Sequence, residues 1–437
     1  MAAQTGKGPA RTGLTARRGA LGLLEAVLDR GELLSAAIDD ADGPLAGLAP
    51  EDRARAQRLA IAVLRHLAPA DAVLKPFLRK PPPPAARMIL RLAVVELCLL
   101  DEAPHGVVDS AVALIGADPR TARLKGLANA VLRNAVEAGP EIWARQHAQR
   151  LPGWLRGRVQ SAYGGRLTAV IETAHAAGAP LDLTARGDAA TLADAVGGIV
   201  LPTGSVRLAD PGRVSALPGY ETGAFWVQDA AAAVPARLLA PQAGETVLDL
   251  CAAPGGKTLQ LAAAGAAVTA LDLSETRLAR LHQNLTRTGL TATVVAADAL
   301  DWAGGPFEAV LLDAPCSATG TIRRHPDLPF VKSAADLKPL VALQAALIDR
   351  ALGLLAPGGR LVFCTCSLLP EEGEAQIRAA LDRHPGLAVD LPDLAGPDLA
   401  GVEPEWAGPE GIRLRPDYWA DRGGMDGFFM TRLRLPG

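Results

Sequence analysis

Two cysteines that directly follow apolar runs in the C-terminal half are the residues most suited to chemistry. Cys316 follows the run 311–315, and Cys366 follows the run 361–365. An α/β sheet presents its reactive groups where strands end and turns begin. A thiolate attacks electrophilic carbon and can leave again, so two placed thiols predict covalent catalysis with a bond-making and a bond-breaking step. An isolated cysteine is more often a small buried apolar residue, so the neighbouring motifs decide between these interpretations.

A glycine loop follows an earlier apolar run of the same half. It reads Asp249-Leu250-Cys251-Ala252-Ala253-Pro254-Gly255-Gly256-Lys257-Thr258. Its glycines let backbone approach a ligand, and a helix beginning at Lys257 offers free amides. A phosphate-binding P-loop requires a glycine where Cys251 stands, and the spaced glycines of a dinucleotide fingerprint are absent. The loop therefore indicates a ligand other than a nucleoside triphosphate or a dinucleotide.

Acidic residues end the next two apolar runs. Asp272 lies about 20 residues beyond the loop, which suits the diol of a ribose, and Asp298 is placed to meet an adenine. Helix N-capping is the alternative role for each aspartate. Acidic strand ends around a loop unsuited to phosphate predict an adenosyl ligand without phosphates. S-adenosyl-L-methionine fits, because its sulfonium is cationic and its ribose needs a diol acceptor.

The elements that must position these residues alternate between strand and helix. We expect strands over 246–250, 267–272, 293–295, 307–313 and 360–364, with helical spacing of leucines between them. Such alternation predicts an α/β fold with a mainly parallel sheet and helices on both faces. Ligands then bind at the carboxyl ends of the strands.

The chain before this sheet divides into two further regions. Residues 1–138 predict an all-helical domain of about six helices, with the prolines 81–84 separating two of them. Residues 139–235 predict a helical bridge and a small α/β module whose strands lie near 181–186, 200–201, 206–208 and 224–227. The third domain is expected to span 236–437.

Composition narrows the class of protein. The 437 residues have 49% hydrophobic content and a mean hydropathy of +0.18, which a large core requires. No apolar run approaches the roughly 20 residues of a membrane helix, and residues 1–13 lack a signal-peptide pattern. Five irregularly spaced cysteines predict neither a disulfide framework nor a metal site. We therefore expect a cytoplasmic protein without bound metal.

Charge is distributed unevenly along the chain. The net charge is −3, but residues 1–150 hold 20 Lys and Arg against 16 Asp and Glu. Basic residues cluster at Arg17 and Arg18, at 53–58 and at 75–80. Such clusters are either phosphate contacts or ordinary solvated helix faces. Aromatic residues are only 4% of the chain, so nucleic-acid contacts would depend more on Arg and Lys than on base stacking.

These motifs resemble the RNA 5-methylcytidine methyltransferases of the Sun/Fmu family over almost the whole chain. The loop 249–258 is similar to the family's cofactor loop, and 313–320 with 323–327 to its fourth motif. The segment 365–367 with 370–372 is similar to the sixth motif, and 426–430 to the closing strand. The helical segments 104–109 and 126–133 are similar to the NusB RNA-binding fold. The resemblance implies a Rossmann-like class I methyltransferase domain preceded by an all-α NusB-like domain.

By this resemblance, Cys366 is the nucleophile that attacks C6 of cytosine, Cys316 assists product release and Asp313 hydrogen-bonds the activated base. Lys257 lies near the cofactor, where its charge could lower a thiol pKa. The residues implied to bind S-adenosyl-L-methionine are Cys251, Ala252, Ala253, Pro254, Gly255, Gly256, Lys257, Asp272, Asp298 and Asp313. The implied substrate is small-subunit (16S) ribosomal RNA before the subunit is mature, with its base unpaired or flipped out. We expect a monomer.

Three alternatives stay open at this point. The chain could methylate a tRNA or another rRNA, or it could be an inert NusB-like RNA-binding assembly factor. The Pro315-Cys316 pair resembles the nucleophile of DNA cytosine methyltransferases, which would reverse the roles of the two cysteines. In the loop after Cys316, Arg323, Arg324 and His325 are candidate RNA contacts, with a solvated loop as the simpler interpretation.

Overall fold

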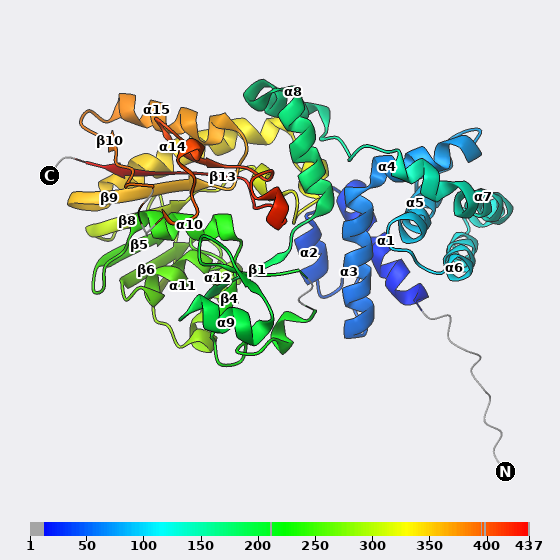
Figure 1. Cartoon of the computed structure of the whole chain (residues 1–437), viewed down its shortest axis with the longest axis horizontal. Coiled ribbons are helices and arrows are strands. Elements are labelled where there is room, and N and C mark those ends of the chain that lie inside the picture. The colour runs from blue at the N-terminus through cyan, green and yellow to red at the C-terminus, as the bar shows by residue number, and fades with distance from the viewer. Residues whose placement is uncertain (1–12, 210–211, 395, 397–398, 436–437) are drawn as a thin grey trace, which may run out of the picture. The chain divides into compact units, whose positions relative to one another are not determined.

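The computed structural model describes residues 13–209, 212–394, 396 and 399–435 (Figure 1). The segment 1–12, where we expected no signal peptide, lies outside the described residues. Two compact units emerge from the fold. The first comprises the described residues to Arg156 together with Gly165–Ala177 and Arg324–Lys332, and the second comprises the remainder. Among the described residues, no helix combines the length and apolarity needed to cross a bilayer.

The first unit is helical, as the leucine and valine spacing predicts. Its α-helices are α1 (Leu14–Leu28), α2 (Leu34–Asp39), α3 (Pro50–Arg65), α4 (Leu67–Leu74), α5 (Pro84–Cys98), α6 (Pro104–Ala117) and α7 (Lys125–Ala144). Three begin with proline at the first helical position, where its missing N–H costs nothing. The described part contains seven α-helices where we expected about six, because the non-helical backbone of His66 separates α3 from α4.

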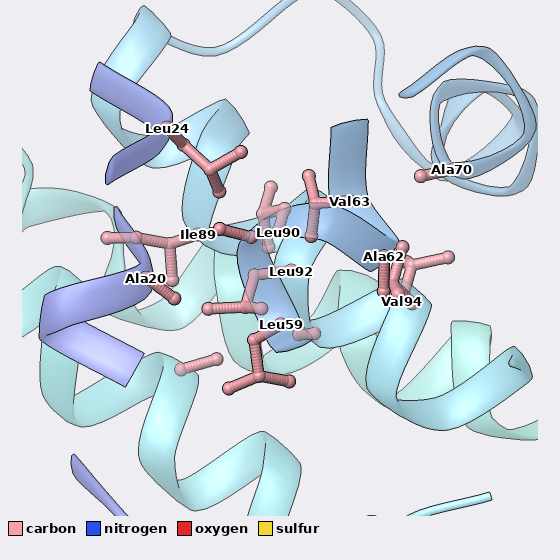
Figure 2. Close-up of a cluster of buried hydrophobic side chains, with 14 of the residues drawn as sticks. Ala20, Leu24, Leu59, Ala62, Val63, Ala70, Ile89, Leu90, Leu92 and Val94 are labelled. Carbon is pink, nitrogen blue, oxygen red and sulfur yellow. The ribbon is translucent and has the colours of Figure 1, made fainter. Parts of the chain in front are cut away.

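The core of this unit forms where α1, α3 and α5 pack together. Figure 2 shows Leu24, Leu59, Val63, Leu90 and Leu92 directed toward one another from these helices. Each is at most 2% exposed. Removing such a side chain typically costs several kcal/mol (about 2–5) because the cavity collapses only in part. The apolar stripes predicted from the sequence are therefore the surfaces that hold the unit together.

A segment distant in sequence completes the first unit. Residues Arg324–Lys332, which follow the Cys316 loop, contain the short helix α13 (Leu328–Val331). Asp327 Oδ2 accepts a hydrogen bond of 2.9 Å from the backbone N–H of Leu34, the first residue of α2. Phe330 packs against the helical core. The carboxylate thereby satisfies one free N–H at the start of a helix that has no N-cap side chain of its own.

The second unit contains the predicted small α/β module. Its antiparallel sheet has the order β2-β3-β1-β4, formed by β1 (Leu181–Ala185), β2 (Ile199–Val200), β3 (Val206–Leu208) and β4 (Phe225–Val227), with α9 (Ala189–Val196) against it. The preceding bridge is α8 (Gly153–Ala177), whose two helical segments join at Gly164 with φ +79°. Glycine suits this position because a side chain disfavours positive φ.

A larger sheet carries the C-terminal half. Its parallel strands are β5 (Thr246–Leu250), β6 (Ala267–Asp272), β7 (Thr293–Ala296), β8 (Phe307–Asp313) and β9 (Leu355–Thr365). Their spatial order is β9-β8-β5-β6-β7, so the chain reverses direction across the sheet at β5. The sequence predicted all five strands, and three have the predicted bounds. The prediction of a Rossmann-like α/β fold that follows a helical domain in the chain is confirmed.

Side chains alternate between the two faces of this sheet. Val247, Leu311 and Cys364 face one apolar cluster, which also includes α10 (Ala230–Leu239) and α11 (Gly256–Ala263). Leu248 and Leu312 face the other cluster with α14 (Leu337–Gly353) and α15 (Glu374–Arg383). Helix α12 (Glu275–Thr288) packs near β6. Both faces are covered, which explains why these strands read as continuous apolar runs.

The far edge of the sheet was only partly predicted. The closing strand expected near 426–430 is β13 (Phe428–Arg434), which pairs antiparallel with β9. Beyond it lie β12 (Gly411–Leu414) and β11 (Ala407–Gly408), while β10 (Ala388–Val389) also pairs with β13. These short strands lack a clear alternation of their own, and long-range pairing creates them.

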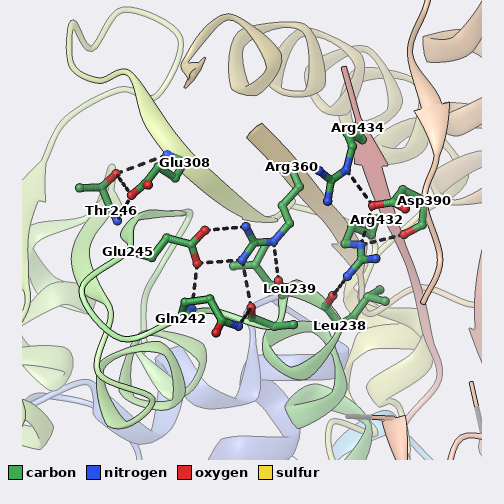
Figure 3. Close-up of polar contacts among 11 residues, drawn as sticks. Leu238, Leu239, Gln242, Glu245, Thr246, Glu308, Arg360, Asp390, Arg432 and Arg434 are labelled. Atoms are coloured by element: carbon green, nitrogen blue, oxygen red, sulfur yellow. Dashed lines mark hydrogen bonds and ion pairs between the residues drawn. The ribbon is translucent and has the colours of Figure 1, made fainter. Parts of the chain in front are cut away.

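Polar contacts hold the sheet at the starts of its strands, opposite the carboxyl ends (Figure 3). Arg360 on β9 donates to Glu245, which immediately precedes β5, with Nη1–Oε1 at 2.5 Å and Nη2–Oε2 at 2.8 Å. Its Nε donates to the carbonyl of Leu239 at 2.7 Å, near the end of α10. One guanidinium therefore satisfies helix carbonyls and a carboxylate at once, which favours bidentate arginine over lysine.

We predict that R360M lowers the free energy of unfolding by about 1–3 kcal/mol, since Glu245 loses its partner at a largely buried site. Urea denaturation measures this change. R434M is the matched control, because Arg434 is half-exposed and its pair with Asp390 is a surface pair. Equal losses in both variants would contradict this role of Arg360.

Candidate functional site

The two candidate cysteines lie side by side. Strands β8 and β9 pair in parallel with Asp313 opposite Cys364, so the loops that follow them leave the same edge of the sheet. The Cys316 Sγ and Cys366 Sγ atoms are 3.5 Å apart, and both side chains are partly exposed. The Gly320 N–H donates to the carbonyl of Cys366 at 2.9 Å and ties the two loops together. The structure thus brings together the thiols that the sequence separates by fifty residues.

The environment of Cys316 favours its protonated form. Its hydrogen bond with Cys366, its burial and the nearby negative charges raise the pKa of Cys316 well above the usual thiol value. A thiol with a raised pKa keeps its proton and donates it in a hydrogen bond. Either sulfur of the pair can act as the hydrogen-bond donor to the other.

Lys257 and Asp313 form an ion pair next to the thiols. Lys257 Nζ lies 2.7 Å from Asp313 Oδ2 and 5.3 Å from the centre of the Phe428 ring. Burial alone would lower the pKa of Lys257, but the charge of Asp313 raises it. Cys364 also contacts Asp313, with its Sγ 3.5 Å from Oδ1. Lys257 favours the Cys364 thiolate, yet burial and Asp313 outweigh it and raise the pKa of Cys364 well above normal.

The glycine loop is held by Asp272 at the end of β6. Asp272 is buried, and its Oδ2 accepts from the backbone N–H of Ala253 at 3.0 Å. Cys251 and Gly255 adopt positive φ angles of +61° and +108°. A Cβ on Gly255 would collide with the side chain of Leu281 on α12, so glycine is required there. Burial raises the pKa of Cys251 to about 12, and its side chain packs against the apolar cluster on one face of the sheet.

Asp249 lies inside β5 beneath the same loop. It is 0% exposed, and its Oδ2 accepts from Thr258 Oγ1 at 2.5 Å, while no donor among the described residues reaches Oδ1. Burial raises the pKa of Asp249 to about 7. This buried carboxylate fixes the start of α11, and its unpartnered oxygen marks a place for a donor from a ligand or water.

Asp298 follows β7 and is exposed. Its Oδ1 accepts from the backbone N–H of Leu300 at 2.9 Å, which shapes its own turn. Because β8, β5, β6 and β7 are consecutive neighbours, Asp313, the glycine loop, Asp272 and Asp298 follow one another along a single edge. This edge presents acidic groups, a glycine loop and a helix N-terminus, the donors and acceptors that an adenosyl amino acid requires.

One candidate RNA contact is wrong. Arg323 is 1% exposed, and its guanidinium pairs with Asp229 at 2.9 Å and Asp426 at 2.8 Å. Arg17 in the first unit is likewise buried against Glu96 at 2.7 Å. Both were counted with the basic residues from the sequence, which cannot tell a buried arginine from a solvated one. Arg324 and His325 stay predictions as RNA contacts.

The sequence gives no sign of the contacts that Glu372 makes. The resemblance places Glu372 in the sixth motif and implies no contact for it. The Glu372 side chain is 0% exposed and accepts hydrogen bonds from the residues that follow both cysteines, Ser317 and Ser367. A glutamate fully buried beside two short polar loops is visible only in the fold. In the part of the chain that the structure describes, no group of three His, Cys, Asp or Glu side chains is arranged to hold a metal ion.

Comparison with known proteins gives a family match in each of the two units. The family described as 16S rRNA methyltransferase RsmB/F matches residues 236–434, and the NusB family matches 14–137. The chain is 37% identical to the ribosomal RNA small subunit methyltransferase B of Salmonella newport, over 94% of this chain and 96% of that protein.

Solved structures give the same picture for the fold. A methyltransferase homologue from Pyrococcus horikoshii is 28% identical, with a TM-score of 0.54 over 64% of this chain and 93% of that one. The structure titled PH0851 shares the fold, with 23% identity and a TM-score of 0.69 over 95% of this chain and 98% of that one.

We predict that D249N changes how stability depends on pH. The pKa of Asp249 is raised in the folded protein, so the carboxyl stabilises the fold below about pH 4 and that contribution is lost as pH rises toward about 7. The loss is on the order of 4 kcal/mol when it is complete. Asparagine is neutral at every pH, so the variant should gain stability relative to the parent between pH 5 and 8. Urea unfolding of the ligand-free protein measures this difference, and parallel profiles would contradict the role of burial.

Proposed function

The chain belongs to the RsmB/F family of 16S rRNA methyltransferases, and from this premise we propose that it transfers a methyl group from S-adenosyl-L-methionine to C5 of a cytidine in small-subunit ribosomal RNA. The observation that carries the proposal is the thiol pair, 3.5 Å apart, beside the Lys257–Asp313 ion pair at the carboxyl ends of the sheet. Cytosine C5 is a poor nucleophile, and a thiolate at C6 is a direct way to activate it.

The acidic edge supports the choice of cofactor. The loop 251–257 with the start of α11 would hold the amino acid part, where free helix amides suit a carboxylate. Asp272 has lone pairs left to accept from the ribose hydroxyls, and Asp298 lies one strand further toward the adenine. Asp249 and Asp313 disfavour phosphates but suit a cationic ligand. When bound, this cofactor supplies an electrophilic methyl group.

We propose Cys366 as the nucleophile. Its thiolate forms a bond to C6 of the cytosine, and the electron pair released into the ring makes C5 reactive. Asp313 hydrogen-bonds the base edge and stabilises the activated ring, while Lys257 holds the Asp313 carboxylate in place. The position of Cys316 supports this assignment, because its sulfur lies 3.5 Å from that of Cys366 and its thiol can donate toward the attacking sulfur.

Cys316 is then placed to assist release. After methylation, C5 loses its proton to a base, the C5–C6 double bond returns and the C6–S bond breaks with its electron pair on Cys366 sulfur. A hydrogen bond from the Cys316 S–H stabilises that departing thiolate. The two cysteines therefore have unequal roles, one making the bond and the other helping to break it.

The helical unit and the position of the thiols both bear on the choice of substrate. The NusB family match at 14–137 supports an RNA-binding role for the helical unit. A base in a duplex would have to be flipped out to reach the thiols, which favours rRNA that is not yet part of a mature subunit. We propose that the protein acts as a monomer in the cytoplasm.

We predict that the protein transfers labelled methyl groups from S-adenosyl-L-methionine to protein-free 16S rRNA and forms 5-methylcytidine there. Scintillation counting of the RNA, followed by nucleoside analysis, measures this. Parallel reactions contain 23S rRNA, bulk tRNA and intact small subunits. Preferential transfer to tRNA or 23S rRNA would identify the alternative substrate, and RNA binding without any transfer would support an inert assembly factor.

The two cysteines should respond differently to substitution. C366S should abolish both product and covalent adduct, because no sulfur reaches C6. C316S should retain the attack but release product slowly, so that an RNA–protein adduct survives denaturing electrophoresis. The opposite pattern would assign the nucleophile to Cys316. C98S is the control, since burial raises the pKa of Cys98 to about 11 and it lies in the helical unit.

A further inference from the structure

A single buried carboxylate joins the two cysteine loops. Glu372 ends the turn Pro370–Glu372 and is 0% exposed. Its Oε1 accepts from the backbone N–H of Ser317 at 2.8 Å and from Gln344 Nε2 at 3.1 Å. Its Oε2 accepts from Ser367 Oγ at 2.5 Å and from the Ser317 hydroxyl. Ser317 directly follows Cys316, and Ser367 directly follows Cys366, so Glu372 reaches the residue next to each thiol.

These hydrogen bonds belong to a larger polar network inside the apolar fold. Thr319 Oγ1 lies 3.2 Å from Ser367 Oγ and accepts from the Leu368 N–H at 3.0 Å. The Gln344 amide also donates to the Pro315 carbonyl at 2.8 Å, just before Cys316. The Thr365 hydroxyl donates to the Glu372 carbonyl at 2.9 Å, just before Cys366. Each loop is therefore held on both sides of its cysteine.

The hydrogen bonds of Glu372 do more than fill space in the core. Among the described residues, the donors to the Glu372 carboxylate are neutral, and their hydrogen bonds together with the nearby charge of Arg413 offset the cost of burying it. An apolar side chain of similar volume would fill the same space without that cost. A fully satisfied polar network instead specifies one geometry, and here the geometry it specifies is that of the two loops.

We propose that Glu372 is a positioning residue that sets the distance between the Cys316 and Cys366 sulfur atoms. This inference rests on the proposed function, in which the two thiols act in succession on one base. Glu372 touches neither substrate nor cofactor in this role. It acts through Ser317 and Ser367, and a shift of about 1 Å in a reacting group is enough to cost about 100-fold in rate.

The length and the charge of the side chain can be tested separately. E372D keeps the charge but shortens the reach, so it cannot bond to both loops at once. E372Q keeps the length, and the serine hydroxyls can reorient to accept from its amide. We therefore expect kcat to fall about 100-fold in E372D and about 10-fold or less in E372Q, while KM for S-adenosyl-L-methionine stays within about twofold.

Glu371 provides a matched control on the same turn. Its side chain is 42% exposed and pairs with Arg158 at 2.6 Å. E371D should leave kcat, KM and the melting temperature unchanged, because a surface pair contributes little. A similar loss of kcat in E371D and E372D would show that the turn itself matters and would overturn the specific role of Glu372.

The alkylation rates of the two thiols in the full-length protein report on the geometry of the two cysteine loops. The measurement needs neither RNA nor cofactor. Iodoacetamide labelling followed by peptide mass spectrometry gives separate rates for Cys316 and Cys366. E372D should change both rates relative to the parent, whereas E371D should change neither. Parental labelling rates together with parental kcat in E372D would overturn the proposal. Because this measurement needs no methyl transfer, a protein inactive on every RNA would reject the proposed function, and the labelling rates would still test the role of Glu372.

A milder variant covers the possibility that E372D does not fold. S317A removes one hydroxyl donor but leaves the backbone N–H of residue 317 bonded to Glu372. We expect a loss of kcat of up to about 10-fold in S317A, and no further loss when it is combined with E372Q, because both changes act on one network. Fully multiplicative losses, or a loss of kcat that only parallels a lower melting temperature, would indicate a general structural role and overturn the proposal.

Discussion

The parallel pairing of β8 with β9 is the constraint on which the site depends. Their register places Asp313 opposite Cys364, so the chain leaves both strands at one edge and the two following loops must share the same small space. Cys316 and Cys366 come within 3.5 Å of each other for this reason. The apolar side chains that bury both faces of the sheet keep this register, since a slip of one residue would turn every side chain to the opposite face.

Several carboxyl groups lie around this edge of the sheet, and each has a different kind of hydrogen-bond or ion-pair partner. Asp313 is paired with Lys257, Asp272 accepts one backbone hydrogen bond from the glycine loop, and Glu372 accepts from serine side chains and amides. Asp249 has a single hydroxyl donor and a raised pKa. A site with these carboxylates suits a cationic cofactor and a neutral base. The hydrogen bond with Cys366 and burial, with a smaller contribution from Glu372, raise the pKa of the Cys316 thiol above its usual value.

Buried ion pairs also hold the loop that contains Cys316. Arg323 links the Cys316 loop to Asp229 and Asp426, which belong to α10's start and to the segment before β13. A buried arginine with two carboxylate partners gives a defined geometry more than a large net stabilisation. The same residue illustrates why counting charges is a weak guide to RNA-binding surfaces. Arg17 and Arg323 both appear basic in the sequence, but their partners lie far along the chain.

The sequence by itself determined the order of strands and helices, because apolar periodicity and turn residues are local properties. It also determined the two cysteines, the glycine loop and the acidic strand ends, since these motifs each lie within a short segment. Only the tertiary structure decided the antiparallel pairing of β13 with its neighbours, the burial of Arg323, and the contacts of Glu372. Each of these depends on contacts between residues distant in sequence, where pairing and burial are set by the packed fold and no local pattern predicts them.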